Sequence, residues 1–445
     1  MLTRRHFINL SAFSGMAAAT APLWSSFLSR QAFAQSANPS SYKAVVLVAL
    51  PGGNDGNNTI IPTDGDAYSE YAKLRGTVAL PLASCNSLNT ISNLGSIALH
   101  PSLVNVARRF NQGQALVVAN VGPLVADTTK ELLLSDPSLQ PQSLFSHSAG
   151  AAQWESSTTL GLPETGWGGR IAELYTSQSG SLPPVLSASG NCTFARGNTV
   201  QGIAVQVGGS GTIAVPAGLQ SAINTLVRNN VQSDNLIVSQ LAQLRESAMN
   251  AQATLNQAAS YGQPLKAAFS SSAFGATMQK IAQIINGRSV VGAARQMFYC
   301  TQGNYDHHQD LIANQASQLT DLDTNLGAFM KALDEMSLTN QVLVCTHSDF
   351  NRSMQPNATL GTDHGWGNHQ LILGGGITGG RLIGNLPDLE LGGRSDFGIQ
   401  GLWIPTISVT QMTAGIGNWM GLNATQISNV FPDLSKFKQG AIQLL

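Results

Sequence analysis

The stretch Val45-Val46-Leu47-Val48-Ala49-Leu50-Pro51-Gly52-Gly53 decides the fold class of this chain. A short apolar, β-branched run that ends in Pro-Gly-Gly is typical of a buried strand that leads into a turn. A second apolar run at residues 115–121 follows an amphipathic stretch at 102–111. The order strand, helix, strand favours a βαβ unit and therefore a parallel sheet.

The rest of the chain continues this alternation. Apolar residues recur near helical spacing at 217–260, 276–297 and 308–336. Short buried strands are indicated at 297–300, 341–346 and 371–373. We therefore predict an α/β fold with a doubly wound, mostly parallel sheet flanked by helices. Residues 35–445 should form one domain, with residues 190–275 as a helical insertion or cap.

Composition excludes several classes of protein. Of 445 residues, 43% are hydrophobic and 11% are charged, with a net charge of −1. Disordered chains are richer in charge and poorer in apolar residues, so disorder is disfavoured. No basic excess is available to neutralise a phosphate backbone, so we expect no nucleic acid as a binding partner.

The first 34 residues have the layout of an export signal. Arg4-Arg5-His6-Phe7 precedes an apolar stretch that reaches about Leu28, and Ala32-Phe33-Ala34 is a small-x-small cleavage pattern. The paired arginines are typical of the bacterial twin-arginine signal. We expect the twin-arginine translocation machinery as a partner and a periplasmic or secreted mature protein. No other apolar run approaches the length of a membrane span.

Removing these residues takes away three cations and no acid, which leaves a net charge of −4. The twin-arginine route carries proteins that are already folded, often around a metal. That is a reason to look for a metal site.

Histidine and aspartate gather in one part of the chain. Five of the seven histidines that follow the predicted signal lie at 307–369. Three polar clusters in this part follow or precede predicted strands: 304–308, 346–352 and 361–365. Asp55 follows the first strand in a glycine-rich turn. Because ligands bind at the carboxyl ends of parallel strands, these clusters can meet at one sheet edge. Carboxylate and imidazole together suit zinc or manganese. Alternatively, each cluster is an ordinary turn, for which Asp, Asn and Gly are common residues.

A set of short motifs identifies the chain further. It resembles the twin-arginine-exported family called domain of unknown function 1501, which is related to the alkaline phosphatase and sulfatase superfamily. The motifs that carry this resemblance run through nearly all of the mature chain: Gly52-Gly53-Asn54-Asp55-Gly56, His100-Pro101-Ser102-Leu103, Ser146-His147, Gly166-Trp167-Gly168-Gly169-Arg170, Tyr305-Asp306-His307-His308, Ser348-Asp349-Phe350-Asn351-Arg352-Ser353 and Asp363-His364.

The resemblance implies an alkaline-phosphatase-like fold and an exported hydrolase of phosphate or sulfate esters with one or two divalent metal ions. Its implied substrate is an anionic ester, small or polymeric. By the same analogy, Arg352 pairs with the oxygens of the anion through its fork. The implied metal ligands are Asp55, Asp306, His308, Asp349, Asp363 and His364.

The nucleophile and the second metal are open points. Ser146 is the candidate nucleophile, and His147 next to it is a second candidate catalytic residue. Helix capping is an equal alternative for Ser146. Phe350 stands where the superfamily often has His, and Asp349 stands where the family has Glu. Either departure could empty one metal site. The alternative function is a non-catalytic periplasmic or cell-envelope protein that keeps the fold for binding or structure.

Overall fold

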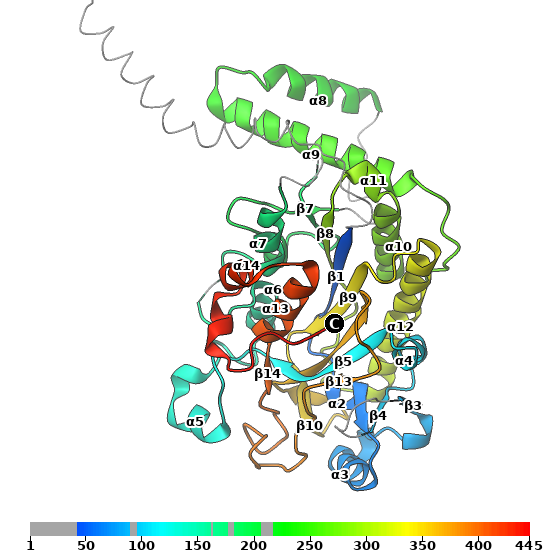
Figure 1. Cartoon of the computed structure of the whole chain (residues 1–445), viewed down its shortest axis with the longest axis vertical. Helices are drawn as coiled ribbons and strands as arrows, with labels where there is room; N and C mark the ends of the chain where they lie inside the picture. The colour runs from blue at the N-terminus through cyan, green and yellow to red at the C-terminus, as the bar shows by residue number, and fades with distance from the viewer. Residues whose placement is uncertain (1–41, 90–95, 162, 177–181, 206–216) are drawn as a thin grey trace, which may run out of the picture.

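The computed structural model describes residues 42–445 apart from 90–95, 162, 177–181 and 206–216 (Figure 1). The predicted export signal lies outside the described residues. In the described part of the chain, no helix is long and apolar enough to cross a membrane.

A nine-stranded sheet forms the centre of the molecule. Its strand order is β13-β5-β12-β9-β1-β8-β6-β7, and β14 also pairs with β5. Every pair is parallel except those of β12, which is antiparallel to β5 and β9. The strands are β1 (Lys43–Leu50), β5 (Ala115–Gly122), β6 (Val185–Ser187), β7 (Ile203–Ala204), β8 (Arg295–Thr301), β9 (Val342–Ser348), β12 (Asn368–Gly374), β13 (Leu382–Ile383) and β14 (Ile407–Ser408).

The mostly parallel sheet is therefore confirmed, with one difference in detail. The run at 115–121 is a strand, β5, but β9 and β12 separate it from β1. The strands at 45–50 and 115–121 are thus not neighbours, although they point in the same direction. The partners of β1 come from much later in the chain, and both of them, β8 and β9, pair with it along nearly its whole length.

Helices cover both faces of the sheet, as a doubly wound fold requires. Ala44, Val46, Val48 and Leu50 of β1 join one buried cluster, and Val45, Leu47 and Ala49 join the other. Both faces are buried because the strand is apolar throughout. The first cluster packs under α4 (Val104–Asn111), α9 (Leu236–Ser260), α10 (Ala273–Asn286) and α12 (Leu311–Glu335). The second packs under α6 (His147–Ser156), α7 (Trp167–Leu174), α13 (Val409–Met420) and α14 (Ala424–Val430).

The segment 190–275 holds a helical pair. Helices α8 (Ala217–Asn230) and α9 pack together and lie at one end of the molecule, away from the sheet (Figure 1). Only the second half of α9 reaches the core, where Leu255 and Ala258 are fully buried and the helix contacts α10 and α11 (Arg288–Val291). The same segment also contains β7, which pairs with β6 in the main sheet.

Smaller elements surround the carboxyl edge of the sheet. The pair β10 (Arg352–Pro356) and β11 (Thr362–His364) places Arg352 directly opposite His364. A second small sheet has the order β2 (Ile60–Pro62), β4 (Ile97–Leu99), β3 (Asn86–Ser87). The remaining α-helices of the described residues are α2 (Gly56–Thr59), α3 (Gly65–Arg75) and α5 (Lys130–Ser135). This edge holds the residues that the sequence singled out.

Candidate metal centre

Three neighbouring strands deliver the polar clusters to one place. Strands β9, β1 and β8 lie side by side and run parallel, so the turns that follow them meet at their carboxyl ends. Gly52 makes that meeting close. Its φ is +98°, and a Cβ there would lie 2.5 Å from the backbone nitrogen of Asp306. Glycine at this position therefore lets the loop after β1 contact the loop after β8.

Asp306 lies at the centre of a group of histidines. Its Oδ1 is 3.0 Å from Nε2 of His308, 3.6 Å from Nε2 of His147 and 3.8 Å from Nε2 of His364. The Nε2 atoms of His308 and His364 are 3.2 Å apart. Ligand atoms of His147, Asp306 and His364 all lie within 4.8 Å of one another. We call Asp306 and these three histidines the Asp306 cluster.

The other ring nitrogen of each histidine is held by an oxygen. Nδ1 of His364 donates to the carbonyl oxygen of Phe145 at 2.8 Å. Nδ1 of His147 is 2.8 Å from Asp349 Oδ2, and Nδ1 of His308 is 3.3 Å from Asp363 Oδ1. A carbonyl oxygen only accepts, so the neutral His364 ring carries its proton on Nδ1 and its lone pair on Nε2. The carboxylates of Asp349 and Asp363 are acceptors beside Nδ1 of His147 and of His308 in the same way.

Burial keeps one of these rings neutral. It lowers the pKa of His364, although the hydrogen bond to Phe145 acts in the opposite direction. The Nε2 atoms of His308 and His364 face each other at 3.2 Å, and two lone pairs at that distance repel unless a proton or a metal ion lies between them. An imidazole oriented from behind by an oxygen is also the usual arrangement of a metal ligand.

The spacing of the Asp306 cluster fits a tetrahedral ion. For ligands about 2.0–2.1 Å from zinc, the tetrahedral edge between two ligand atoms is about 3.3 Å. The four separations given above, 3.0, 3.2, 3.6 and 3.8 Å, lie on either side of that edge. Three imidazoles and one carboxylate suit zinc, and the same donors also bind manganese.

The side chain of Arg352 links the loops that surround the Asp306 cluster. This side chain is fully buried. Its Nε donates to the carbonyl of Gly53 at 2.9 Å, and Nη1 to that of Thr362 at 3.1 Å. Nη2 donates to Asp306 and to the carbonyl of Gly52. These donors are committed within the protein, so the structure does not present the free guanidinium fork that the resemblance implies for a substrate anion.

The same guanidinium fixes the charge of the cluster. Burial acts to raise the pKa of Asp306, but the hydrogen bond and charge of Arg352 outweigh it and hold that pKa below its usual value. Asp306 is therefore ionised at neutral pH. Nη1 of Arg352 also lies 3.3 Å from Nε2 of His308, so it competes with any metal for that lone pair.

Asp55 is not brought into the Asp306 cluster. Its Oδ2 forms an ion pair with Arg75 at 2.6 Å, and both side chains are fully buried. Its Oδ1 accepts the backbone N–H of Asn58 and caps α2. The carboxylate that the resemblance assigns to a metal is therefore already neutralised by an arginine.

Asp349 and Asp363 lie behind the histidines. Asp349 accepts from His147 and from the backbone N–H of Gly52 at 2.8 Å, and it is buried. Asp363 is about half exposed and accepts from Asn357 at 3.2 Å as well as facing His308. In this structure both carboxylates orient imidazoles.

Ser146 lies next to the cluster in sequence and has no hydrogen bond to it. It occupies the N-cap position of α6, yet its side chain makes no capping bond. Its Oγ is 3.2 Å from Oγ of Ser148. His147, the other catalytic candidate of this motif, lies among the imidazoles of the Asp306 cluster.

The comparison with known proteins comes to the same family as the motifs. The family described as "Protein of unknown function (DUF1501)" matches residues 42–431. The chain belongs to the DUF1501 family. No curated protein matches it.

Two solved structures are weakly similar. The lipoteichoic acid synthase LtaP from Listeria monocytogenes has 8% identity and a TM-score of 0.35, covering 86% of this chain and 74% of that one. Ps i-CgsB, in complex with k-i-k-neocarrahexaose, has 10% identity and a TM-score of 0.34, covering 89% and 76%.

Two parts of the site in this DUF1501 chain carry no signal in the sequence. Arg75 lies on α3, twenty residues after its partner Asp55 and outside every motif. The Phe145 anchor of His364 is a backbone carbonyl, which any residue would supply. Phe350 stands where the superfamily often has His. The centroid of its ring lies 4.5 Å from that of the His364 ring and 4.8 Å from that of the His147 ring. An apolar ring thus forms one wall of the centre.

Proposed function

We propose that this chain is an exported, metal-dependent hydrolase of phosphate or sulfate esters, with one divalent ion bound by Asp306, His147, His308 and His364. The observation that carries the proposal is the convergence of three Nε2 atoms on Asp306 Oδ1, with every Nδ1 held by an oxygen. The proposal is for one ion because Asp55 is paired with Arg75 and Phe350 adds no ligand.

When bound, a divalent ion supplies Lewis-acid polarisation of an ester oxygen and compensation of developing negative charge. The residues of the chain orient the groups that would bind this ion. Asp349 and Asp363 fix the imidazole rings, and Arg352 fixes Asp306. The first turn of α6 begins at His147 without a side-chain cap, so its N–H groups are available to an anionic oxygen. The proposal needs no side-chain nucleophile, and none of its steps depends on Ser146.

The test uses the full chain exported from a twin-arginine-competent host. We expect about one equivalent of zinc or manganese by elemental analysis, and metal-dependent turnover of aryl phosphates or sulfates. Asp306→Asn should lose both the metal and the turnover. Asp388→Asn, which changes an exposed carboxylate paired with Arg394, is the matched control. Metal-free protein with no metal-dependent turnover would end the proposal.

Export is part of the proposal and is tested separately. Replacing Arg4 and Arg5 together by lysine should leave the protein in the cytoplasm, measured by fractionation with a periplasmic marker enzyme. Export of this double variant at the normal rate would argue against the twin-arginine route.

A second candidate function is a binding or structural role in the cell envelope without turnover. The closed Asp55–Arg75 pair and the absence of a cluster contact from Ser146 favour it. It predicts a metal that raises thermal stability while no ester in the panel is hydrolysed.

A further inference from the structure

A cavity of about 490 Å³ lies at the same edge of the sheet as the Asp306 cluster. Helix α6 joins the two sites. His147, its first residue, belongs to the cluster, and the next residue, Ser148, lines the cavity. Consecutive Cα atoms are about 3.8 Å apart, so the two sites are neighbours.

The opposite wall continues the order of the strands. Ser189 lies two residues after the end of β6, and Thr301 ends β8, the strand whose following loop carries Asp306. The cavity therefore occupies the strand ends next to those of the metal centre. This is where open α/β sheets bind their ligands, and the volume falls in the usual range for a ligand site.

The one buried carboxylate in the cavity wall is fully used within the protein. Glu155 accepts from the Tyr299 hydroxyl at 2.7 Å and from the backbone N–H groups of Thr193 and Phe194 at 2.6 and 3.2 Å. Glu155 thus fastens the loop at 192–196 to α6 and β8. Arg196, the one cation among the lining residues, is exposed and donates to Thr193 Oγ1 at 2.9 Å. Neither group offers an unpaired buried charge for an ionic ligand.

The remaining lining is rich in neutral hydrogen-bonding groups. Ser189 and Thr301 bring their hydroxyls within 3.0 Å of each other. The amides of Asn191 and Gln201 are exposed at the cavity and make no side-chain hydrogen bond among the described residues. Hydroxyls and amides both donate and accept, which matches a ligand that carries several hydroxyl groups.

Two alanines keep the α6 side of the cavity open. Ala151 and Ala152 line it, three and four residues after Ser148, and so lie on the same face of the helix. Their small side chains leave the volume to a ligand. A larger side chain at either position would project into it.

We propose that this cavity binds the uncharged, polyhydroxylated part of the substrate, a sugar unit, while the ester group lies at the Asp306 cluster. This inference rests on the proposed hydrolase function and names its substrate class as sugar phosphate or sugar sulfate esters. Recognition comes from the neutral hydroxyl and amide lining, and the short step from Ser148 to His147 places the ester at the metal centre.

The test compares sugar esters with an ester that lacks a sugar. Probes are the 6-phosphates and 6-sulfates of glucose, galactose and N-acetylglucosamine, against 4-nitrophenyl phosphate and sulfate. Ala152→Phe fills the cavity, and Asn191→Ala with Gln201→Ala removes polar groups without filling it. Ala222→Phe, the same change at an exposed position of α8 outside the cavity lining, is the control.

We expect Ala152→Phe to lower kcat/KM for at least one sugar ester about tenfold or more, mainly through KM, and to leave the nitrophenyl ester within about twofold. The double variant should lower the same value by a smaller factor, and the control should lower neither. Equal losses on both substrates, or no loss on any sugar ester, would overturn the proposal.

Failure of the hydrolase function would look different. If the metal-loaded protein hydrolyses no ester, calorimetric titration with the same sugar phosphates and sulfates decides the cavity alone. Binding by the wild type that Ala152→Phe abolishes supports the cavity proposal, and absence of binding by the wild type overturns it.

Discussion

Two aspartates at the same edge of the sheet have opposite surroundings. Asp55 follows β1 and is fully buried against a fully buried arginine, Arg75. Asp306 follows β8, its side chain is 37% exposed, and three imidazoles surround it. The exposure matters here because solvent and a ligand can reach Asp306 and cannot reach Asp55.

The comparison shows that a carboxylate at a strand end is not in itself a metal ligand. A buried carboxylate is stable only with a partner that compensates its charge and satisfies its lone pairs. Arg75 and the Asn58 N–H do both for Asp55. The Asp306 cluster has Arg352 as one cation, yet it also gathers lone pairs that a single arginine cannot all satisfy. We therefore expect function from the Asp306 cluster and not from the Asp55–Arg75 pair.

The largest expected effect is a loss of folding stability when the buried Asp55–Arg75 ion pair is broken. Arg75→Met leaves the Asp55 carboxylate buried without a partner, and we expect a loss of about 3–5 kcal/mol in the free energy of unfolding. Urea unfolding measures it. Arg394→Met breaks an exposed pair with Asp388 instead and should cost less than about 1 kcal/mol.

A double variant of this ion pair distinguishes Asp55 as the partner of Arg75 from Asp55 as a metal ligand. Combining Asp55→Asn with Arg75→Met removes both charges and should recover part of the lost stability, with metal content unchanged. If Asp55 were a ligand, Asp55→Asn alone would remove one equivalent of metal from the protein, and the contrast between the two aspartates would be lost.

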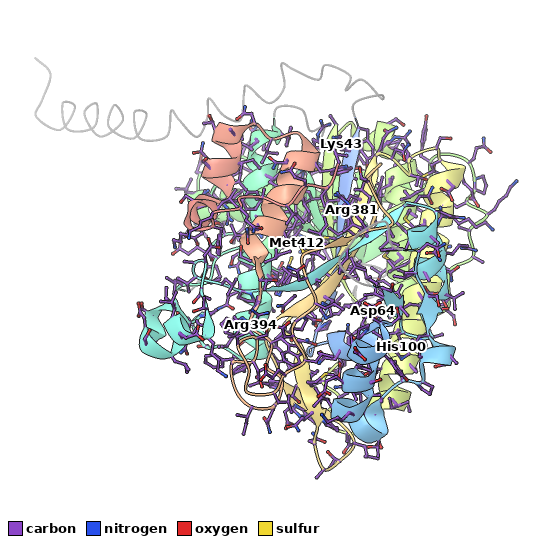
Figure 2. All side chains as sticks on the ribbon, turned by 60° about the horizontal axis from the view of Figure 1, so that its bottom comes forward. Lys43, Asp64, His100, Arg381, Arg394 and Met412 are labelled. Atoms are coloured by element: carbon purple, nitrogen blue, oxygen red, sulfur yellow. The ribbon has the colours of Figure 1, made fainter. Side chains whose placement is uncertain are left out.

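The next largest effect is a loss of folding stability at acid pH, caused by His100, a buried histidine near Asp55. His100, labelled in Figure 2, directly follows β4, and burial lowers its pKa to about 4 even though Asp55 acts to raise it. The unfolded chain binds this proton near pH 6.5 and the folded chain only near pH 4. Stability from the neutral ring is therefore complete above pH 6.5 and falls as the pH drops toward 4, by about 3 kcal/mol in total.

Unfolding curves between pH 7 and pH 4 test this. His100→Asn keeps an acceptor near the Ser102 N–H that Nδ1 now accepts at 3.0 Å, and it removes the titration. The pH dependence should become shallower but not vanish, because burial also lowers the pKa of His347 to about 3 and of His369 to about 4. An unchanged slope would show that His100 is not the neutral, buried base described here.

A smaller effect is expected at Asp349, whose carboxylate contacts His147 of the Asp306 cluster. Asp349→Asn replaces the carboxylate that orients His147 with an amide whose NH₂ group could face Nδ1 and reverse the tautomer. Loss of such an orienting carboxylate lowers metal affinity about 10–100-fold. Competition with a chelator of known zinc affinity measures it. An affinity equal to that of the wild type would mean that Nε2 of His147 does not bind the ion.

The strands and most of the cluster could be predicted because they depend on local sequence. The run at 45–50 is apolar at every position, ends in Pro-Gly-Gly and is rich in β-branched residues, which is the pattern of a strand buried on both faces such as β1. Asp306, His308, Asp349 and His364 all lie close to predicted strands, and topology brings the ends of those strands together.

What the sequence could not supply depends on contacts between distant segments. The partner of Asp55 lies on α3, and nothing in the α3 sequence distinguishes Arg75 from the neighbouring Lys73, which is exposed and pairs with Glu70. The place of His147 in the cluster depends on where α6 packs above β9, which no motif encodes. The strand order also depends on distant segments, because β9 and β12, from late in the chain, lie between β5 and β1.

The smallest effect is expected at Asp363, the exposed counterpart of Asp349. Its side chain is 53% exposed and lies 3.3 Å from His308 Nδ1, a longer contact than the 2.8 Å between Asp349 and His147. Water can replace an exposed acceptor, so Asp363→Asn should lower zinc affinity by less than about tenfold, measured by the same chelator competition. A loss at Asp363 as large as at Asp349 would place the ion nearer His308 than His147. The site would then centre on the loop after β8 rather than on the N-terminus of α6.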